Sequence, residues 1–373
     1  MRKYALIIPL AFAISGTAFA TYSFLDTFII VKNATKVTFS STYDIPLGLT
    51  TKTSSSNNSS NKSSNASNTS KGGSSSYATT IDQNSHQYYE DLTTEQIAAL
   101  FTSSKVFRER EHYSDPDIYI DITTHRDDAD TTTYYAADIR IKNLGYFRTA
   151  LANDTFGLNV KERTSDMCKR HKGILAINGD TYGSQEGGYV IRNGNLQPGQ
   201  FRSTKNLERK KPDDLIIKKD GTFEIIDERE TSFEEVKDQD PLHVFSFGPA
   251  LVNRSEIMVT ERDEVGTALS GNRNQRCAIG IVSPGHYYFV VSDGRNNDSR
   301  GISLYTLANI MKDLHCETAY NLDGGGSATM YLDNGTGNAD GLAHLVNVPG
   351  QLQGDASVKQ REVSDIVYIG KEQ

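Results

Sequence analysis

Tryptophan is absent from this chain of 373 residues, cysteine occurs only three times, and basic residues are fewer than acidic ones. Cys168, Cys277 and Cys316 follow no zinc-binding spacing and form no cysteine–histidine pair of the kind that activates a thiol, so their apolar surroundings predict small buried residues. The formal net charge of -8 argues against a nucleic-acid-binding protein, because binding to the phosphate backbone requires a basic surface.

The N-terminus carries Arg2 and Lys3 followed by a largely apolar run up to residue 31. Such a pattern directs a chain into the membrane and leaves the following domain outside. Residues 18–20 offer a cleavage site, but the apolar character resumes beyond them, and the run is long enough to remain as an anchor. We therefore expect residues 1–31 to be a signal-anchor or a signal peptide. The protein would be single-pass in the cell membrane with an extracellular domain, or secreted if the signal is cleaved.

A polar, low-complexity segment follows this leader. Between residues 53 and 70 every residue is Ser, Thr or Asn except Lys62 and Ala66. This composition buries too little apolar surface to offset the entropy of ordering, and it predicts a disordered stalk over residues 32–87. Beyond it we expect a helix and hairpin region at 88–146 that packs on a larger domain at 147–373.

The remaining chain alternates between strand and turn signals. Residues 118–122 and 135–141 alternate in polarity on either side of a polar turn, which predicts a hairpin. Ser303 precedes a helix that has one apolar face. We expect an α+β fold, with a twisted mixed, hairpin-rich β-sheet core and a few flanking helices, whose site loops gather along one edge.

The most informative stretch joins two apolar segments through three consecutive glycines, Gly324 to Gly326. The first segment delivers Asn321 and Asp323 to this bend, and Ser327 leads out of it. A bare triple glycine is usually a flexible turn. Between two polar-tipped strands, however, it indicates a site, because glycine lets a ligand approach the backbone amides and so builds an anion site without a P-loop.

Two other strand ends carry polar residues. The segment 287–292 delivers Asp293, and a helix connects it to the strand of Asp323, as in a βαβ unit. If these strands are neighbours, both carboxylates lie at one edge and suit acid and base work or a divalent cation. The third strand ends in Asn178-Gly179-Asp180, followed by a long loop before the next hairpin, which again indicates a site.

The segment Asn-Leu-Asp-Gly-Gly-Gly-Ser at 321–327, together with Asp293-Gly294-Arg295 and Ser299-Arg300-Gly301, resembles the phosphodiester glycosidase family, in particular its bacterial, exopolysaccharide-associated branch. The resemblance covers about residues 147–370. It implies hydrolysis of a sugar-1-phosphodiester in envelope or extracellular glycans, with cleavage at the anomeric centre. The products are a free sugar and a phosphomonoester. No cofactor is required by this chemistry, although a divalent cation remains possible.

This resemblance assigns roles to particular residues. Asp323, Asp293 and Asp180 are the candidate catalytic carboxylates, and their division into acid, base and nucleophile stays open. Arg276 lies at a strand start where the family places an arginine. It would form a phosphate clamp with Arg295 and Arg300, because a guanidinium binds phosphate oxygens bidentately. The expected substrate contacts are Asn178, Gly179, Arg276, Gly294, Arg295, Arg300, Asn321, Gly324, Gly325, Gly326, Ser327, Thr329 and Asn347. Without tryptophan, sugar stacking would use tyrosines such as Tyr182, Tyr189 or Tyr331.

Two other functions fit parts of the pattern. A non-catalytic, membrane-anchored protein that binds glycophosphates or exopolysaccharide would need the arginines and glycines but not the carboxylates beside them. A serine hydrolase acting through Ser327 is disfavoured, because Gly-Gly-Gly-Ser-Ala is not a nucleophile elbow and no histidine stands in a suitable position. The expected partners are a phosphorylated glycan and, through the N-terminal segment, a membrane.

Overall fold

The computed structural model describes residues 20–21, 23–25, 29–38, 44–47, 92–103, 106–108, 111–265, 268–269, 271–333, 344–350 and 360–371. Most of the predicted leader and residues 39–43 and 48–87 of the predicted stalk lie outside this set. Among the described residues, no helix combines the length and the apolar character needed to cross a membrane.

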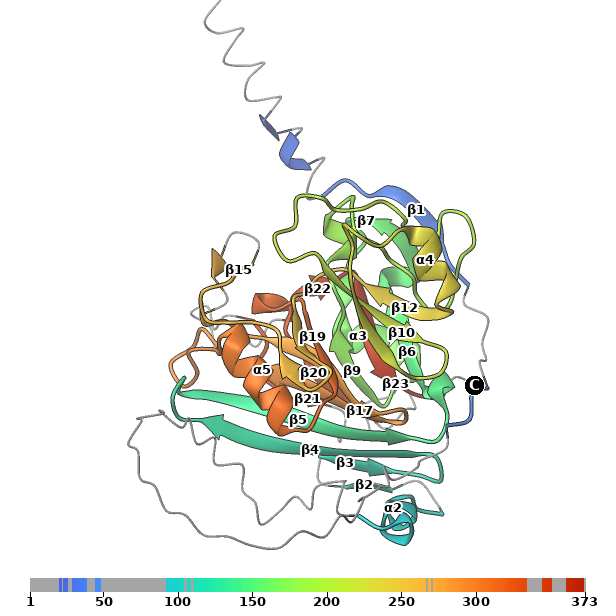
Figure 1. Cartoon of the computed structure of the whole chain (residues 1–373), viewed down its shortest axis with the longest axis vertical. Coiled ribbons are helices and arrows are strands. Elements are labelled where there is room, and N and C mark those ends of the chain that lie inside the picture. The colour runs from blue at the N-terminus through green and yellow to red at the C-terminus, as the bar shows by residue number, and fades with distance from the viewer. Residues whose placement is uncertain are drawn as a thin grey trace, which may run out of the picture.

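A nine-stranded antiparallel sheet runs through the molecule in the order β14-β13-β19-β17-β18-β5-β4-β3-β2. Its long strands β4 and β5 lie toward the bottom of Figure 1, with α2 (Thr94–Leu100) beyond β2. The strands are β2 (Val106–Arg108), β3 (His112–Ser114), β4 (Ile118–Asp127), β5 (Thr132–Ile141), β13 (Ala250–Asn253), β14 (Glu256–Ile257), β17 (Cys277–Ser283), β18 (His286–Ser292) and β19 (Thr318–Leu322).

Two smaller antiparallel sheets complete the core. The five-stranded sheet has the order β21-β20-β9-β23-β6, with β6 (Phe147–Leu151), β9 (Leu175–Asn178), β20 (Met330–Leu332), β21 (His344–Leu345) and β23 (Asp365–Ile369). The three-stranded sheet has the order β11-β10-β12, with β10 (Asp213–Lys218), β11 (Phe223–Asp227) and β12 (Pro241–Phe245). Two-stranded pairs join β1 (Lys32–Lys36) to β7 (Thr155–Leu158), β8 (Glu162–Arg163) to β22 (Glu362–Val363), and β15 (Glu264–Val265) to β16 (Ala268–Leu269).

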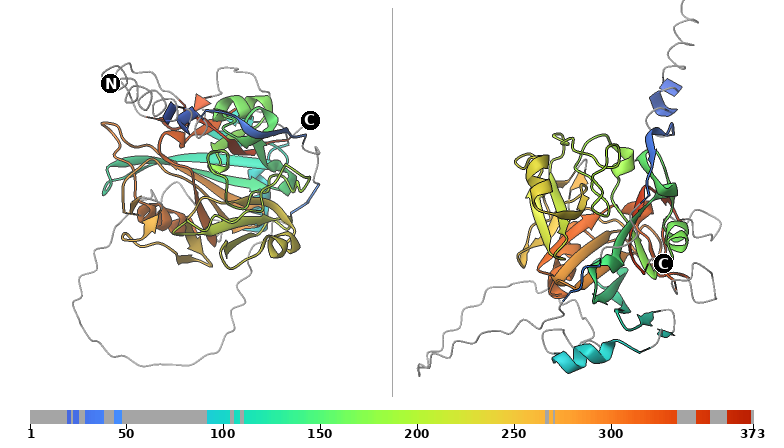
Figure 2. Two further views of the ribbon diagram at one scale, coloured as in Figure 1. Left: turned by 90° about the horizontal axis from the view of Figure 1, so that it is seen from above. Right: turned by 90° about the vertical axis from the view of Figure 1, so that its right-hand side faces the viewer.

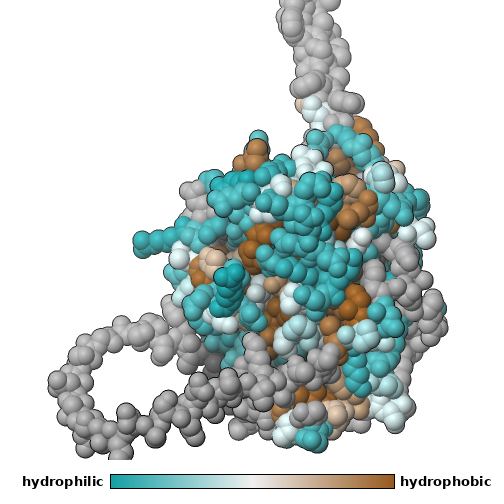
Figure 3. All heavy atoms as spheres, turned by 45° about the vertical axis from the view of Figure 1, so that its right-hand side comes forward, coloured by the Kyte–Doolittle hydropathy of each residue, from teal (hydrophilic) through white to brown (hydrophobic). Residues whose placement is uncertain are grey.

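The main core lies between these sheets. Ile139, Phe289 and Leu322 of the nine-stranded sheet are fully buried in one cluster with Val367 and Phe245 of the other two sheets. Full burial of such a side chain contributes about 1.5–3 kcal/mol to folding. The face shown in Figure 3 is correspondingly mainly hydrophilic, with only scattered apolar patches.

Helices cover the outer faces. α5 (Leu304–Asp313) places Leu307 and Met311 on the outer face of the nine-stranded sheet, and α3 (Thr164–Arg170) places Met167 on the five-stranded sheet. The 6-residue α4 (Phe233–Asp238) contacts β12. Ser303 caps α5 by accepting a hydrogen bond from the Thr306 N–H, as its sequence predicts. All three cysteines are buried and none forms a disulfide, which confirms their predicted structural character.

The predicted sheet-rich core with few helices is confirmed, but the prediction of a mixed sheet is wrong, because every strand pairing is antiparallel within the described residues. The hairpin at 118–141 also does more than pack on the following domain. β5 pairs with β18 from Arg140 opposite His286 to Tyr134 opposite Ser292. The long edge of β5 has backbone groups to satisfy, and β18 supplies their partners.

The predicted stalk boundary at residue 32 is also wrong. β1 pairs with β7, and a Cβ on Gly157 would lie only 2.8 Å from the Ala34 Cα, so the two strands are in close contact. Val37 is buried with Phe156 in a small cluster. The composition of residues 53–70 does not extend to these first residues, which hold apolar side chains that the domain buries. Figure 2 shows the described blue segment, which includes β1, at the outer edge of the domain.

Candidate active site

The triple-glycine bend lies between β19 and β20 and contains a short 3-10 helix, η5 (Gly325–Ser327). Gly325 has φ of 58°, in the left-handed region that favours glycine. Its N–H donates to the carbonyl of Gln275 at 2.9 Å. A Cβ on Gly324 would lie 2.6 Å from that same carbonyl oxygen, so the bend can follow this path only with glycine.

The separate sequence fragments converge on this bend. The Asn178 Nδ2 donates to the Asp323 carbonyl at 2.7 Å, and its Oδ1 accepts from the Thr329 N–H at 3.1 Å. On the other side, the Gln275 Nε2 donates to the Gly294 carbonyl at 2.9 Å. The ends of β9, β18 and β19 and the start of β17 are therefore joined around one site, as the sequence predicted.

Asp323 is a half-buried carboxylate at the head of the bend. Burial raises its pKa, while a hydrogen bond from Ser327 and the charge of Arg361 oppose this rise. The charge of Asp180 raises the pKa further. Asp323 also raises the pKa of Asp365, which is fully buried. The three carboxylates of Asp180, Asp323 and Asp365 thus form one interacting group.

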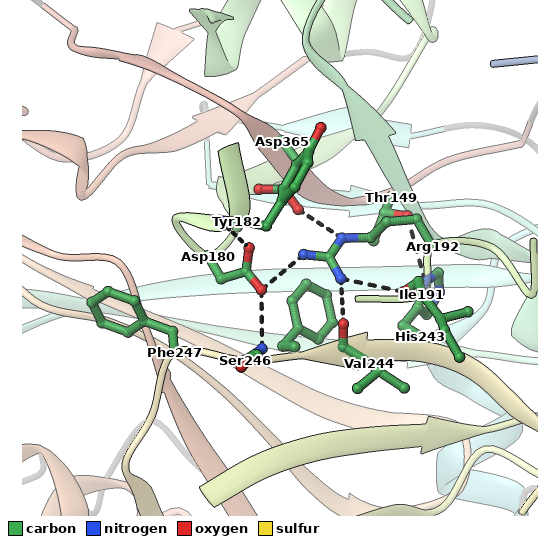
Figure 4. Close-up of polar contacts among 12 residues, drawn as sticks. Thr149, Asp180, Tyr182, Ile191, Arg192, His243, Val244, Ser246, Phe247 and Asp365 are labelled. Carbon is green, nitrogen blue, oxygen red and sulfur yellow. Dashed lines mark hydrogen bonds and ion pairs between the residues drawn. The ribbon is translucent and has the colours of Figure 1, made fainter. Parts of the chain in front are cut away.

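A buried arginine holds two members of this group (Figure 4). The Arg192 guanidinium is 2.9 Å from Asp180 Oδ2 and 2.7 Å from Asp365 Oδ2, and it also donates to the Val244 carbonyl. Its plane lies over the Phe245 ring at 4.2 Å. Burial raises the pKa of Asp365 to about 7, against the opposing charge of Arg192. This arrangement keeps the Asp180 loop in place behind Asp323.

Asp180 has further partners of its own. Its Oδ1 accepts from the Tyr182 N–H at 2.9 Å and its Oδ2 from the Ser246 N–H at 3.1 Å. With Arg192 added, both of its oxygens have partners in the protein. Gly179 is required beside it, because a Cβ there would collide with the Asp365 carboxylate. Asp180 and Gly179 are therefore at the site, in positions that shape it.

Two arginines flank the glycine bend. The Arg295 Nη1 lies 3.8 Å from where a Gly325 Cβ would stand, and the Arg361 Nη2 lies 2.8 Å from the corresponding position of Gly326. Both side chains are exposed, and neither forms a hydrogen bond or ion pair with a carboxylate among the described residues. Because the bend lacks Cβ atoms, these guanidiniums approach its backbone closely and leave their donors available to an anion.

The other two predicted clamp arginines lie differently. Cys277 faces the main core, so the preceding Arg276 points to the α5 face of the sheet. There it donates to the carbonyls of Asn272 and Ile302 at 2.6 and 3.2 Å. Burial and the neighbouring Arg295 lower the pKa of Arg276 to about 10. Arg300 is exposed, and the structure shows no contact between its side chain and the other arginines in the described part of the chain.

Asp293 lies at the same sheet edge but is not paired with Asp323. β17 separates β18 from β19, so the condition that these strands are neighbours is not met. The Asp293 Oδ1 accepts from the Val348 N–H at 2.8 Å and its Oδ2 from the Tyr135 hydroxyl at 3.2 Å. Burial raises its pKa. The carboxylates that act on Asp323 are those of Asp180 and Asp365.

Several predicted contact residues are buried against the backbone. The Asn321 amide donates to the Gly248 carbonyl at 2.8 Å, and the Asn347 amide bonds to the backbone of Ala328 and Met330. Asn178, Asn321, Thr329 and Asn347 are all almost fully buried. These side chains position the bend. The tyrosines predicted to stack on sugar are also buried and cannot do so: Tyr182, Tyr189 and Tyr331.

Sequence reasoning missed three charged residues of this site: Arg192, Arg361 and Asp365. Arg192 ends the apolar run Tyr-Val-Ile-Arg in a segment that was interpreted as an ordinary hairpin. An arginine that follows directly on a buried apolar run needs a buried carboxylate as its counter-charge. This requirement is the sequence signal that could have identified Arg192. In the described part of the chain, no group of three or more His, Cys, Asp or Glu residues is arranged to hold a metal ion.

Residues 171–370 match the phosphodiester glycosidase family, and the chain belongs to this family. The SPbeta prophage-derived uncharacterized protein YomE of Bacillus subtilis (strain 168) is 26% identical over 195 residues, which are 51% of this chain and 29% of that protein. This chain therefore spans less than a third of that relative's length.

The fold is shared with a solved enzyme domain. The catalytic domain of zebrafish N-acetylglucosamine-1-phosphodiester alpha-N-acetylglucosaminidase, auto-inhibited by its pro-peptide, aligns with a TM-score of 0.50 at 22% identity. The alignment covers 72% of this chain and 86% of that one. Family membership supports a hydrolase of the glycosidase type.

The bend itself can be tested with Gly324→Ala. The added Cβ would collide with the Gln275 carbonyl oxygen, so the Gly325 hydrogen bond must break and the bend must move. We expect a loss of about 1–3 kcal/mol of stability, together with loss of activity. Gly199→Ala is the control. Its added Cβ would meet only Thr35 Oγ1, at 3.4 Å, and the alanine would adopt a strained backbone conformation with φ of 79°. Thermal unfolding and turnover are measured for both variants. Equal activity in the two would contradict the claim that activity requires the observed backbone path of the bend.

Proposed function

We propose that this protein is an extracytoplasmic hydrolase that cleaves sugar-1-phosphodiester bonds in envelope or extracellular glycans. The observation that carries the proposal is the glycine bend, where a carboxylate of raised pKa stands near two exposed arginines that form no ion pair within 4 Å in the described part of the chain. The zebrafish domain that shares the fold belongs to an N-acetylglucosamine-1-phosphodiester alpha-N-acetylglucosaminidase, which favours this bond type. The predicted leader would place the domain outside the membrane.

The phosphate side of the substrate needs its charge held. Arg295 and Arg361 supply guanidinium donors on either side of the bend. The N–H groups of Gly325 and Ser327 are already bonded to carbonyls, and that of Gly324 interacts with the Asp323 carboxylate. Gly326 therefore provides the bend N–H that has no acceptor among the described residues. Preorganised donors of this kind stabilise developing negative charge, because they need no rearrangement during the reaction.

The sugar side needs a base. In the proposed reaction Asp323 accepts a proton from water while the water oxygen bonds to the anomeric carbon. The bond from that carbon to the phosphate oxygen breaks, and its electron pair leaves with the phosphate. The products are a free sugar and a phosphomonoester, and the transition state resembles an oxocarbenium ion. Asp180 and Asp365, tied to Arg192, position this base.

The experiment uses the purified chain and the methyl phosphodiester of N-acetyl-α-glucosamine 1-phosphate. We expect release of free sugar and methyl phosphate in equal amounts, measured by reducing-sugar assay and by phosphorus NMR. Binding of the diester without release would instead favour the non-catalytic glycophosphate-binding protein. The proposed chemistry needs no cofactor, so activity in excess chelator should match that in buffer; loss of activity would support a divalent cation.

Arg361→Gln tests the assignment of Asp323 through the pH profile. Asp323 must be ionised to act as base, so kcat/KM falls as the pH drops through its raised pKa. The charge of Arg361 holds this pKa down, and its removal moves the acid limb to higher pH. Arg300→Gln removes an exposed arginine away from Asp323 and should leave the limb in place. An unmoved limb in Arg361→Gln would remove Asp323 from the base role.

A further inference from the structure

A hollow of about 620 Å³ opens on the α5 side of the nine-stranded sheet. Its walls come from the β4–β5 turn, from the segments around residues 261 and 272, and from one face of α5. Pockets of roughly 300–1,000 Å³ are typical of small-molecule sites. None of the three candidate catalytic carboxylates lines it, so it is separate from the glycine bend.

Arg276 connects this hollow to the candidate active site. Its Nη2 donates at 2.6 Å to the carbonyl of Asn272, a wall residue, and its Nε donates to the carbonyl of Ile302 next to Ser303, another wall residue. Arg276 is also close enough to Arg295 for the two charges to act on each other. A ligand bound at the bend and one bound in the hollow would thus be separated by this arginine.

The walls of the hollow combine one aromatic ring with mixed donors and acceptors. Tyr305 is half-buried, and its hydroxyl has no hydrogen-bond partner in the described chain. The Asn309 Nδ2 donates to the Tyr305 carbonyl at 2.7 Å, which leaves its Oδ1 as an acceptor. Arg262 forms no ion pair with a described residue, and Asp127 is 6% exposed with one oxygen accepting the Asp130 N–H.

Asp130 and Arg273 form the scaffold of the same walls. The Asp130 Oδ1 pairs with the Arg273 Nε at 2.6 Å, and its Oδ2 accepts from the Thr306 hydroxyl at 2.8 Å. The charges of Asp130 and Arg273 neutralise each other, and the contacts of Asp130 connect the β4–β5 turn to the start of α5. The hollow is also lined by the carboxylates of Asp127 and Glu261, which outnumber the single charge of Arg262, so it disfavours an anion.

We propose that this hollow is a subsite for a neutral sugar residue of the glycan that flanks the scissile phosphodiester. Each sugar hydroxyl both donates and accepts, which matches alternating carboxylate, amide and guanidinium groups. The apolar face of a sugar ring can lie on Tyr305, the aromatic wall residue. A phosphate group would meet the carboxylates of Asp127 and Glu261, and the described residues offer no three-ligand metal arrangement, so a neutral polyhydroxyl ligand fits best. The link to the glycan rests on the proposed function.

The test uses binding and needs no turnover. The full chain is mixed with maltotriose, cellotriose or tri-N-acetylchitotriose, none of which carries phosphate, and saturation-transfer NMR is recorded. We expect saturation of at least one trisaccharide and an affinity at least tenfold weaker in Tyr305→Ala. Lys312→Ala is the matched control, because Lys312 is exposed on the same helix and does not line the hollow. Arg295→Ala should also keep the binding, since Arg295 belongs to the bend.

The outcomes separate this inference from the proposed function. Hydrolysis of the methyl diester without trisaccharide binding, or with binding unaffected by Tyr305→Ala, overturns the subsite and leaves the hydrolase standing. Trisaccharide binding that depends on Tyr305, with no hydrolysis of the diester, supports a sugar site and overturns the hydrolase. Unchanged thermal unfolding of Tyr305→Ala shows that the loss of binding is local.

Discussion

Asp323→Asn is expected to lower kcat for a sugar-1-phosphodiester by about 10²–10⁴-fold, because an amide cannot take the proton from water. The folded protein should be as stable as the parent or slightly more so. Burial raises the pKa of Asp323, which means that the fold disfavours its ionised form, and asparagine carries no charge. The Ser327 contact can still form with the amide oxygen.

Asp293→Asn is the matched comparison for this variant. Asp293 lies at the same edge and also has a pKa raised by burial, but its oxygens bond to Val348 and Tyr135. Steady-state kinetics on both variants, with thermal unfolding as the control for folding, decide between the two carboxylates. A larger loss of kcat in Asp293→Asn than in Asp323→Asn would transfer the base role to Asp293.

Arg192→Met is expected to lower the free energy of unfolding by about 3–5 kcal/mol, because it leaves two buried carboxylates without their counter-charge. Methionine fills much of the space over the Phe245 ring, so the loss is mainly electrostatic. Asp180 would keep the neutral N–H donors of Tyr182 and Ser246, whereas Asp365 would lose its ion pair with Arg192. Denaturant unfolding at neutral pH measures the effect.

The same variant has a defined pH dependence. Asp365 already has a folded-state pKa of about 7, above the unfolded value near 3.8, so its ionisation destabilises the fold as the pH rises through this window. Without Arg192 that pKa rises further, and the penalty grows with pH and shrinks toward acid. Arg229→Met, which breaks an exposed pair with Asp227, should shift the unfolding midpoint far less than Arg192→Met does, because solvent screens an exposed ion pair. A loss in Arg192→Met that did not depend on pH would show that packing, and not charge, is responsible.

Local patterns predicted the parts of the fold that depend on near neighbours. The β4–β5 hairpin and the cap of α5 follow from alternation and from Ser303, which act over a few residues. Strand order depends instead on contacts between distant segments. β17 inserts between β18 and β19, and no local signal distinguishes this arrangement from one in which those two strands are neighbours.

The same division explains the site. Asp323, the glycines and Arg295 were predicted because they lie in short motifs whose residue types are unusual. Arg192 and Asp365 are 173 positions apart in sequence, and only the fold brings them together. Arg276 was placed in the clamp because the family resemblance implies an arginine at this strand start. The direction of the Arg276 side chain depends on which face of β17 lies inside. Cys277 faces the main core, so Arg276 points toward α5.

The pairing of β1 with β7 bears on how the proposed hydrolase could reach a glycan. Lys32 is opposite Leu158, and the Ile30 carbonyl already accepts a hydrogen bond from Asn159. If the preceding apolar segment is retained as the expected anchor, hardly any free tether separates the globule from the lipid, since each residue spans at most about 3.6 Å. The reach of the anchored form would then be confined to polymers brought to the bilayer surface, whereas a cleaved form would diffuse to its targets.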